Sequence, residues 1–220
     1  ETSFKQEDGV HYHARDVAVM RGKFESCPVI LASATPAIET RQQVTLGNYA
    51  EVKLPGRFGP AEMPAIEALD LLEHKPDRGR WLAPPLVQAL EEARVAVVTS
   101  DTIWSPAKAA EFVGRMEAGA IDIVVGTQLV TKGYHFPNLT LVGVVDADLG
   151  LEGGDLRAAE RTFQQIRQVS GRAGRGEKPG RVFIQTHAPG AQVMQALVTG
   201  DSDAFYAAET DARRDAGAPP

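Results

Sequence analysis

The sequence contains almost no cysteine and no long hydrophobic run, and each absence excludes a class of protein. With Cys27 as its one cysteine, the 220-residue chain cannot form an internal disulfide bond or a cysteine-rich zinc site. Its apolar runs, such as 123–125 and 141–145, are far shorter than the roughly 18 to 20 residues that span a bilayer. No secretory signal is recognisable at its start. These features predict a soluble globular chain in the reducing cytoplasm.

A surplus of positive charge is also absent. The chain has 23 Lys and Arg residues against 29 Asp and Glu residues, and its formal net charge is -6. This balance excludes a protein that holds nucleic acid through bulk positive charge, so any nucleic-acid site must be a local patch. The apolar share of 43% is enough to build the core of one or two domains. Because the sequence starts at Glu1 rather than at a methionine, we expect it to be part of a longer protein.

Strand and helix patterns alternate along the chain. Short β-branched runs predict strands at 29–31, 95–98, 121–125, 141–145 and 181–186. Apolar spacing and capping residues predict helices at 16–24, 36–46, 84–93, 105–119 and 156–170, and two more between 191 and 216 that are split at Gly200-Asp201. Strands separated by helices indicate a doubly wound, parallel α/β sheet.

Proline and glycine are concentrated between residues 55 and 80, where they predict an extended connector and a domain boundary. The chain is therefore expected to have four parts. These are a first domain over 1–54, a connector with a short helix over 55–93, a second domain over 94–190 and a helical tail over 191–220.

The strongest local signal is a run of basic residues and glycines at 168–175. If this run is helical, Gln168, Arg172 and Arg175 stand at i, i+4 and i+7 and share one face. Between 157 and 181, seven basic residues stand against two acidic ones, which favours an anionic partner. Two glycines interrupt the run, and glycine suits a sharp turn or a close approach to a ligand. A solvated, arginine-rich helix end is the alternative interpretation.

Two further segments place polar side chains directly after predicted strands. Thr127 and Lys132 follow the strand at 121–125, where they and nearby backbone N–H groups are able to meet phosphate oxygens. A plain strand-to-helix turn is the alternative there. Ser33 and Thr35 follow the strand predicted at 29–31, at the carboxyl end where α/β sheets place their ligand groups.

Three other features have simpler explanations than a functional site. Asp146 and Asp148 follow an apolar strand as a magnesium-binding pair does, but no phosphate-binding loop precedes them, so we expect a structural or capping role. His11 and His13 have no third metal ligand nearby, so we expect them at the surface or at a helix start, and we expect no metal site. We expect Trp104 to be a packing residue.

Together these segments resemble the motor core of superfamily 2 helicases, and closely the PriA family of replication restart helicases. The matching segments are 4–6 and 12–16, which follow the family's DEEH box; Ser33-Ala34-Thr35, its SAT box; 126–128, 132–133 and 136–137, its motif V; and 157–161 with 168–175, its motif VI. Five boxes in the right order cover nearly the whole chain and are more specific than any one alone.

The resemblance implies a RecA-like α/β fold, with the tail of the first motor lobe over 1–54 and most of the second over 94–190. The implied catalytic and nucleotide-binding residues are Gln168, Arg172, Arg175, Gly133 and Gly171. The implied DNA-binding or coupling residues are Ser33, Thr35, Thr127 and Lys132. By resemblance, the two arginines face the γ-phosphate of ATP, which is bound with Mg²⁺ in the family.

The function implied by the resemblance is an ATP-dependent, 3′ to 5′ DNA helicase of replication restart. Its implied partners are single-stranded and forked DNA, primosome proteins and single-strand-binding proteins, in the bacterial cytoplasm at the nucleoid. The family's Gly-Lys-Thr loop, DEEH box and zinc-binding cysteines are absent from the sequence, so we expect the chain alone to be inactive and to hold no zinc. Two alternatives are a non-catalytic module that binds nucleic acid or a partner, and another superfamily 2 translocase such as a fork-reversal enzyme.

Overall fold

The computed structural model describes the residues that build two compact units, 1–51 and 52–220. The described residues are 5–6, 12–54, 56, 62–91, 95–97, 111, 114–115, 118, 123–125, 139–151, 154–174 and 178–218. None of the helices in these ranges is both long enough and apolar enough to cross a membrane.

Unit 1 contains two short antiparallel strands and two helices. Strand β1 (Lys5–Gln6) pairs with β2 (Tyr12–His13), and helices α1 (Ala14–Glu25) and α2 (Ile38–Thr45) follow. The Nδ1 atom of His13 accepts a hydrogen bond from the backbone N–H of Arg15 at 3.2 Å and caps α1. The expected helix-start role of His13 is therefore confirmed, while His11 lies outside the described residues.

The strand predicted at 29–31 is wrong. These residues have no regular secondary structure, and Ile30 is exposed. A strand needs a neighbour to receive its backbone hydrogen bonds, and no strand in the described part of unit 1 runs alongside this segment. The β-branched run therefore identified extended backbone but not a sheet.

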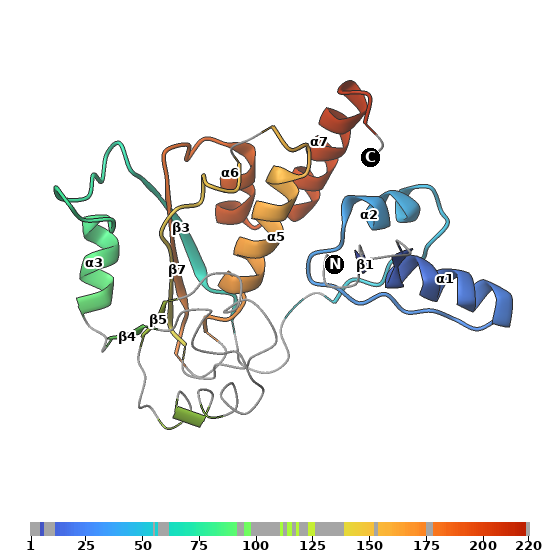
Figure 1. Cartoon of the computed structure of the whole chain (residues 1–220), viewed down its shortest axis with the longest axis horizontal. Helices are drawn as coiled ribbons and strands as arrows, with labels where there is room; N and C mark the ends of the chain where they lie inside the picture. Colours follow the sequence, from blue (N-terminus) through green and yellow to red (C-terminus); the bar gives the residue numbers. More distant parts are fainter. Residues whose placement is uncertain are drawn as a thin grey trace. The chain divides into compact units, whose positions relative to one another are not determined.

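The sheet of unit 2 is parallel throughout. Its order is β3 (Ala65–Asp70), β7 (Arg181–Thr186) and β6 (Leu141–Val144), with β7 in the centre (Figure 1). Leu69 pairs with Gln185 across β3 and β7, and Val144 pairs with Ile184 across β6 and β7. The predicted RecA-like α/β class is thereby confirmed.

A second parallel pair consists of β4 (Val95–Val97) and β5 (Ile123–Val125). Both strands fall where the β-branched runs predicted them.

Strand β3 lies inside the region predicted to be an extended connector, so that prediction is wrong for residues 65–70. The breakers of this region flank the six-residue strand rather than interrupt it. The strand was not predicted because Glu67 and Asp70 break its apolar run. The strand forms because its backbone pairs with β7 over its whole length, although its side-chain pattern does not predict a strand.

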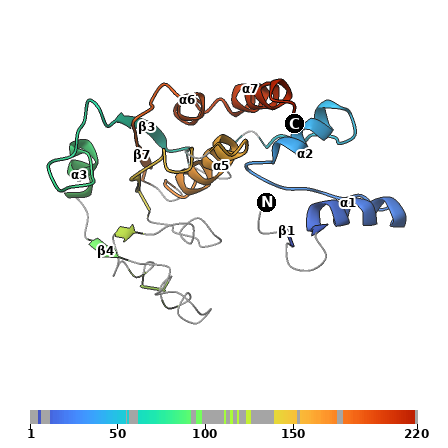
Figure 2. The same ribbon diagram turned by 45° about the horizontal axis from the view of Figure 1, so that its top comes forward.

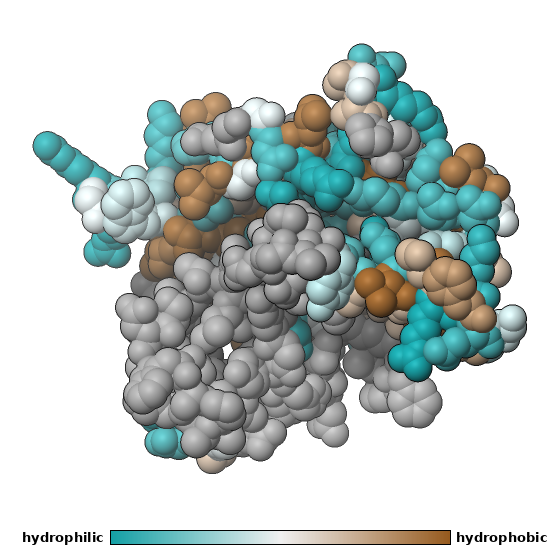
Figure 3. Space-filling view, turned by 45° about the vertical axis from the view of Figure 1, so that its right-hand side comes forward, coloured by the Kyte–Doolittle hydropathy of each residue, from teal (hydrophilic) through white to brown (hydrophobic). Residues whose placement is uncertain are grey.

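Helices cover both faces of this sheet. Helix α3 (Pro84–Glu91) lies on one side, and α5 (Ala158–Ser170) and α6 (Gln192–Thr199) lie on the other, as Figures 1 and 2 show. On the α3 side, Leu69, Ala83, Leu86 and Phe183 form one buried cluster. On the face shown in Figure 3, hydrophobic residues form separate patches between hydrophilic ones.

The last helices belong to the core of unit 2 rather than to a tail. Helix α7 (Ser202–Asp215) follows α6 after Gly200, and the Asp201 carboxylate caps it by accepting from the N–H of Ala204 at 3.0 Å. The predicted split at Gly200-Asp201 is thus confirmed. The Phe205 ring of α7 stacks on the Phe163 ring of α5 with centroids 4.4 Å apart, which joins the two helices.

Candidate functional site

Helix α5 supports the basic segment that the sequence singled out. At its start, the carboxylate of Asp155 accepts hydrogen bonds from the N–H of Arg157 at 2.9 Å and from the guanidinium of Arg161 at 2.7 Å. Within the helix, the buried Glu160 carboxylate accepts from the buried Arg213 guanidinium of α7 at 2.6 Å. Buried charges of this kind must be paired, so α7 fixes the position of α5.

The basic run at 168–175 is not one helix. Helix α5 ends at Ser170, and residues 171–174, which we call the arginine loop, form successive turns. The N–H of Arg172 donates to the carbonyl of Val169 at 2.9 Å, and the N–H of Ala173 donates to the carbonyl of Ser170 at 3.1 Å. The run is therefore not helical over 171–174, so the condition on which the i, i+4, i+7 face was predicted does not hold there, and Arg175 lies outside the described residues.

Two glycines determine the path of the arginine loop. Gly174 has a left-handed backbone with a φ of 68°, a region that suits glycine. A Cβ on Gly174 would lie 2.7 Å from the backbone N of Gly180, and one on Gly180 would lie 2.6 Å from the backbone N of Gly174. The two backbones can approach this closely only because neither residue has a side chain.

The arginine loop is anchored at the amino edge of the sheet. The N–H of Gly174 donates to the carbonyl of Leu139, just before β6, at 2.9 Å. The carbonyl of Gly180 accepts from the N–H of Ala65, the first residue of β3, at 3.1 Å. In Figure 2, α5 leads from the opposite edge down to this end of the sheet. Gly174 of the loop therefore bonds to a residue just before β6, and Gly180, whose backbone lies against Gly174, bonds to the first residue of β3.

The side chains at this edge are suited to an anion. Gln168 is exposed and Arg172 is half-buried, so both reach the surface beside the loop. Lys178 and Arg181 are exposed on the returning segment, and the guanidinium of Arg181 lies 4.8 Å from the centre of the Phe183 ring. This set of amide and cationic donors fits phosphate oxygens. No group of three or more His, Cys, Asp or Glu side chains that could hold a metal occurs among the described residues.

The structure brings together only part of the predicted site. Gln168, Gly171 and Arg172 are neighbours at the end of α5, whereas Arg175 and the motif V residues Thr127, Lys132 and Gly133 lie outside the described residues, as does Trp104.

Ser33 and Thr35 lie in unit 1 in the turn before α2. The Ser33 hydroxyl accepts a hydrogen bond from the N–H of Thr35 at 3.1 Å, and Thr35 is buried. These two residues therefore form a local turn and do not end a strand.

Asp146 and Asp148 have the structural role expected of them. The Asp146 carboxylate accepts from the N–H groups of Asp148 and Leu149 at 3.0 and 3.1 Å. The Asp148 carboxylate accepts from the hydroxyl of Thr186 at 2.5 Å and from the N–H of His187 at 2.6 Å. Both carboxylates thus accept hydrogen bonds from donors at the carboxyl ends of β6 and β7.

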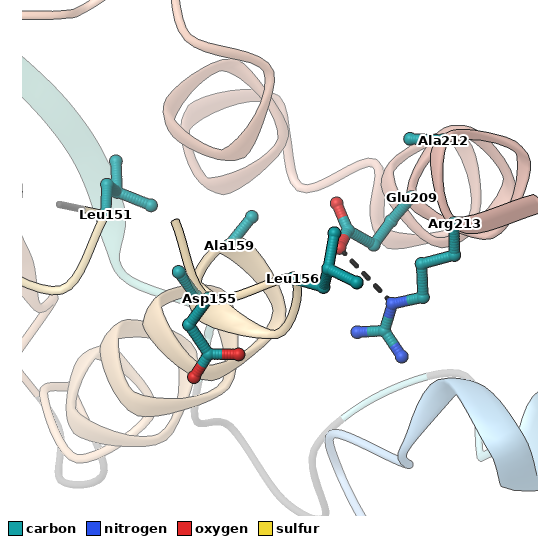
Figure 4. A pocket seen from close by; sticks show the side chains of 8 residues that line it. Leu151, Asp155, Leu156, Ala159, Glu209, Ala212 and Arg213 are labelled. Carbon is teal, nitrogen blue, oxygen red and sulfur yellow. Dashed lines mark ion pairs between the residues drawn. The ribbon is translucent and has the colours of Figure 1, made fainter. Parts of the chain in front are cut away.

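A shallow pocket of about 280 Å³ lies between the start of α5 and the end of α7. In Figure 4, Glu209 and Arg213 of α7 face Asp155, Leu156 and Ala159 across it. Burial raises the pKa of Glu209 above its usual value, while Arg213, at 3.5 Å, opposes that rise. Glu209 pairs with Arg213 inside this pocket and Asp155 pairs with Arg161 beside it, so the pocket serves the packing of α5 on α7.

Sequence reasoning missed Gln185, a fully buried residue in the central strand. Its side-chain oxygen accepts from the N–H of Ala83 at 2.6 Å, and its side-chain nitrogen donates to the carbonyls of Trp81 at 3.0 Å and Val145 at 2.8 Å. A polar residue directly after the apolar run 182–184, inside the strand predicted at 181–186, was the available signal. Gln185 links the carboxyl ends of the strands to the loop before α3.

Comparison with known proteins identifies the family. No family model matches the chain. The replication restart protein PriA of Rickettsia conorii is 32% identical over 99% of this chain and 48% of its own length. The PriA proteins of Bacillus subtilis and Haemophilus influenzae are 30% and 26% identical over the whole chain and 39% and 42% of their own lengths.

The chain thus spans about half, or less, of the length of these relatives. The alignment with the Rickettsia conorii protein extends over 310 residues, so that protein contains residues within the aligned region that have no counterpart in this 220-residue chain. With this identity over nearly all of its residues, the chain belongs to the PriA family of replication restart proteins.

Proposed function

We propose that the chain is part of an ATP-dependent, 3′ to 5′ DNA helicase that acts in replication restart. The observation that carries the proposal is the arginine loop, a rigid turn at the amino edge of a RecA-like sheet in a chain of the PriA family. A surface arginine at a frayed helix end has no need of two closely approaching glycine backbones. A side chain that must meet a phosphate in one orientation does need such a support.

In this proposal, Arg172 and Arg175 donate hydrogen bonds to γ-phosphate oxygens of ATP from the second motor lobe. A guanidinium is planar and matches two phosphate oxygens at once, which stabilises the charge that develops during phosphoryl transfer. Gln168, Gly171 and Gly133 complete the nucleotide side. Magnesium, when bound with ATP, would neutralise phosphate charge, and the described residues contain no group of three or more His, Cys, Asp or Glu side chains that could hold it.

Four residues serve DNA in this proposal. Ser33 and Thr35 couple hydrolysis to DNA movement, and Thr127 and Lys132 contact the strand or relay between the two sites. Single-stranded and forked DNA are the proposed substrates. Primosome and single-strand-binding proteins are the proposed partners, in the cytoplasm at the nucleoid.

The test is an arginine series in a full-length PriA-family protein that carries this chain. Arg172→Ala and Arg175→Ala should each lower DNA-stimulated ATP turnover by about 10³- to 10⁵-fold. Melting temperature and nucleotide affinity should change little, because a surface arginine at a helix end stabilises the fold by at most about 1 kcal/mol. Lysine at either position should restore little activity, because an ammonium lacks the planar fork.

Arg167→Ala is the matched control. Arg167 lies on α5 one turn before the arginine loop, and its variant should keep near-parental turnover. Near-parental activity in the Arg172 and Arg175 variants, or a loss explained by unfolding, would favour the alternative interpretation, in which these arginines form a solvated helix end.

A non-catalytic nucleic-acid-binding module is the second candidate for the 220-residue chain by itself, because its sequence has no Gly-Lys-Thr loop and no DEEH box. Such a chain should release no phosphate from ATP above a buffer blank. It should bind single-stranded DNA with a log–log salt slope of roughly -2 to -3.5, which corresponds to about three to five phosphate contacts. DNA-stimulated phosphate release by the pure chain would exclude this candidate.

A further inference from the structure

The loop between β3 and α3 displays a large aromatic side chain at the surface. This loop, residues 71–82, which we call the Trp81 loop, leaves the carboxyl end of β3 and turns back into α3 (Figure 1). Trp81 is 82% exposed. A tryptophan normally buries most of its area, so one that is held in solvent suggests a surface that meets a partner.

The backbone of the Trp81 loop is fixed although its aromatic ring is exposed. The side chain of Gln185, on the central strand and 1% exposed, holds the backbone on both sides of Leu82 by donating to the carbonyl of Trp81 and accepting from the N–H of Ala83. At the other end of the loop, the N–H of Leu71 donates to the carbonyl of Thr186 at 2.9 Å. The ring is therefore presented from a rigid base, which reduces the entropy lost when it stacks on a ligand.

Three basic side chains precede the ring in the same loop, interspersed with the acidic Glu73 and Asp77. Lys75, Arg78 and Arg80 are exposed, and within the described part of the chain neither Lys75 nor Arg78 forms an ion pair. Among the described residues, the ion pair of Arg80 is a long contact with Asp77, at 3.9 Å. The loop thus exposes three cations and two carboxylates within a few residues of an exposed indole, an excess of one positive charge.

The Trp81 loop is separate from the arginine loop. It follows the carboxyl end of β3 and is held by residues at the carboxyl end of β7, whereas the arginine loop is bonded to the amino ends of the strands. A ligand at Trp81 therefore does not compete with phosphate at Arg172.

We propose that the Trp81 loop is a binding site for single-stranded nucleic acid, with a base stacked on Trp81 and phosphates held by Lys75, Arg78 and Arg80. Stacking platforms flanked by cations are the usual means of binding single strands without sequence preference. A protein partner would need a broader apolar surface, whereas Leu72 is the only other exposed large hydrophobic residue of this loop. The proposal extends the proposed function, because it gives the moving strand a contact apart from the ATP site.

The first experiment measures binding of a labelled oligo(dT) to the 220-residue chain by fluorescence anisotropy. Trp81→Ala should weaken binding by roughly 5- to 160-fold, the value of one stacked base, and Trp81→Phe should recover part of the loss. An oligonucleotide that is abasic along its length keeps the phosphates but removes the bases, so the parent and Trp81→Ala should bind it alike. Melting temperature should be unchanged in both variants because the ring is exposed.

A second experiment reads the contact directly. The chain has two tryptophans, so Trp104→Phe leaves Trp81 as the single tryptophan reporter. Its emission should be quenched by oligo(dT) and not by the abasic strand. If Trp104→Phe fails to fold, the anisotropy series in the parent background decides by itself.

Charge variants test the phosphate contacts. Arg78→Gln with Arg80→Gln should reduce the log–log salt slope by about 1.4, at about 0.7 per phosphate. Arg214→Gln is the matched control, because it removes an exposed arginine of α7 that pairs with Asp211 at 2.8 Å. That control should leave the slope almost unchanged.

Three results would overturn the proposal: unchanged affinity in Trp81→Ala, equal losses for oligo(dT) and the abasic strand, or Trp81→Ala losing binding to a partner protein while DNA binding is intact. These outcomes leave the arginine series untouched. Conversely, normal ATP turnover in the Arg172 and Arg175 variants would reject the proposed function while the Trp81 measurements still stand.

Discussion

Helices α1 and α5 have similar apolar spacing and opposite burial. In α1, Val17, Met20 and Phe24 stand at i, i+3 and i+7, yet all three are exposed, Phe24 by 78%. In α5, Phe163 and Ile166 are 1% and 5% exposed. Periodicity of this kind therefore predicts that a helix forms, but not that anything covers its apolar face.

The difference lies in the partners that each unit offers. Helix α5 has α7 against it, joined by the Phe163–Phe205 stack and by the Glu160–Arg213 pair, and the loop after it is bonded through Gly174 to the backbone just before β6. In the described part of unit 1, α1 has two short strands and one further helix as neighbours along the chain. Function in unit 2 can depend on fixed geometry, because its helices are held by packing, charge and backbone bonds together.

The largest effect is expected in the α5–α7 core. Phe163→Ala removes a fully buried ring that contacts Phe205 and Tyr206, so it should lower the free energy of unfolding by about 3 to 5 kcal/mol. Denaturant unfolding monitored by circular dichroism measures the loss. A loss below 1 kcal/mol, by that measurement, would mean that α5 is not anchored by α7.

A smaller loss is expected in the arginine loop. Gly174→Ala introduces both a left-handed alanine and a backbone clash with Gly180, and should cost at least about 2 kcal/mol. Gly200→Ala is the matched control, since Gly200 has a φ of 76° but open space where its Cβ would stand. Equal losses in both variants, from the same unfolding experiment, would show that the close approach at Gly174 contributes nothing.

The sequence predicted most of what depends on local pattern. Helices α1, α5, α6 and α7 and strands β5, β6 and β7 lie at or near their expected positions, because apolar period, caps and β-branched runs act locally. Strand β3 was missed because Glu67 and Asp70 broke its apolar run, while its pairing with β7 involves residues more than one hundred positions away. The strand predicted at 29–31 was wrong for the converse reason, since local pattern does not supply a neighbour.

The candidate site was predicted in composition and not in shape. The run 168–175 identified Gln168, Gly171 and Arg172 as one group, but a helical face cannot continue through turns that end with a left-handed Gly174. The exposed Trp81 and its support by Gln185 depend on a contact between distant parts of the chain. Sequence spacing therefore predicts which chemical groups form the site, but not how those groups are oriented.

A pH-dependent effect is expected at Glu209, on the face of α7 toward α5. Burial raises the pKa of this carboxyl, so the folded state holds its proton more tightly than the unfolded state. Protonation of Glu209 therefore stabilises the folded state. This contribution to the free energy of unfolding is full below the ordinary pKa of a glutamate and is lost as pH rises through the raised pKa. Glu209→Gln removes the charge, so the variant should gain stability relative to the parent at pH 7.5 and lose that gain near pH 4.5. The difference in melting temperature between the variant and the parent should therefore be larger at pH 7.5 than near pH 4.5. The same difference at both pH values would contradict this prediction.

The smallest effect is expected on the exposed face of α1, and it tests the comparison between α1 and α5 directly. Phe24→Ala should change the free energy of unfolding by no more than about 0.5 kcal/mol, because an exposed ring has little contact area to lose. Ile38→Ala in α2 is the control within the same unit, since Ile38 is fully buried and its truncation should cost about 2 to 5 kcal/mol. The control shows that the assay senses unit 1. If Phe24→Ala cost as much as Ile38→Ala, the α1 face would be covered in the folded protein, and its apolar spacing would have predicted burial as correctly as that of α5.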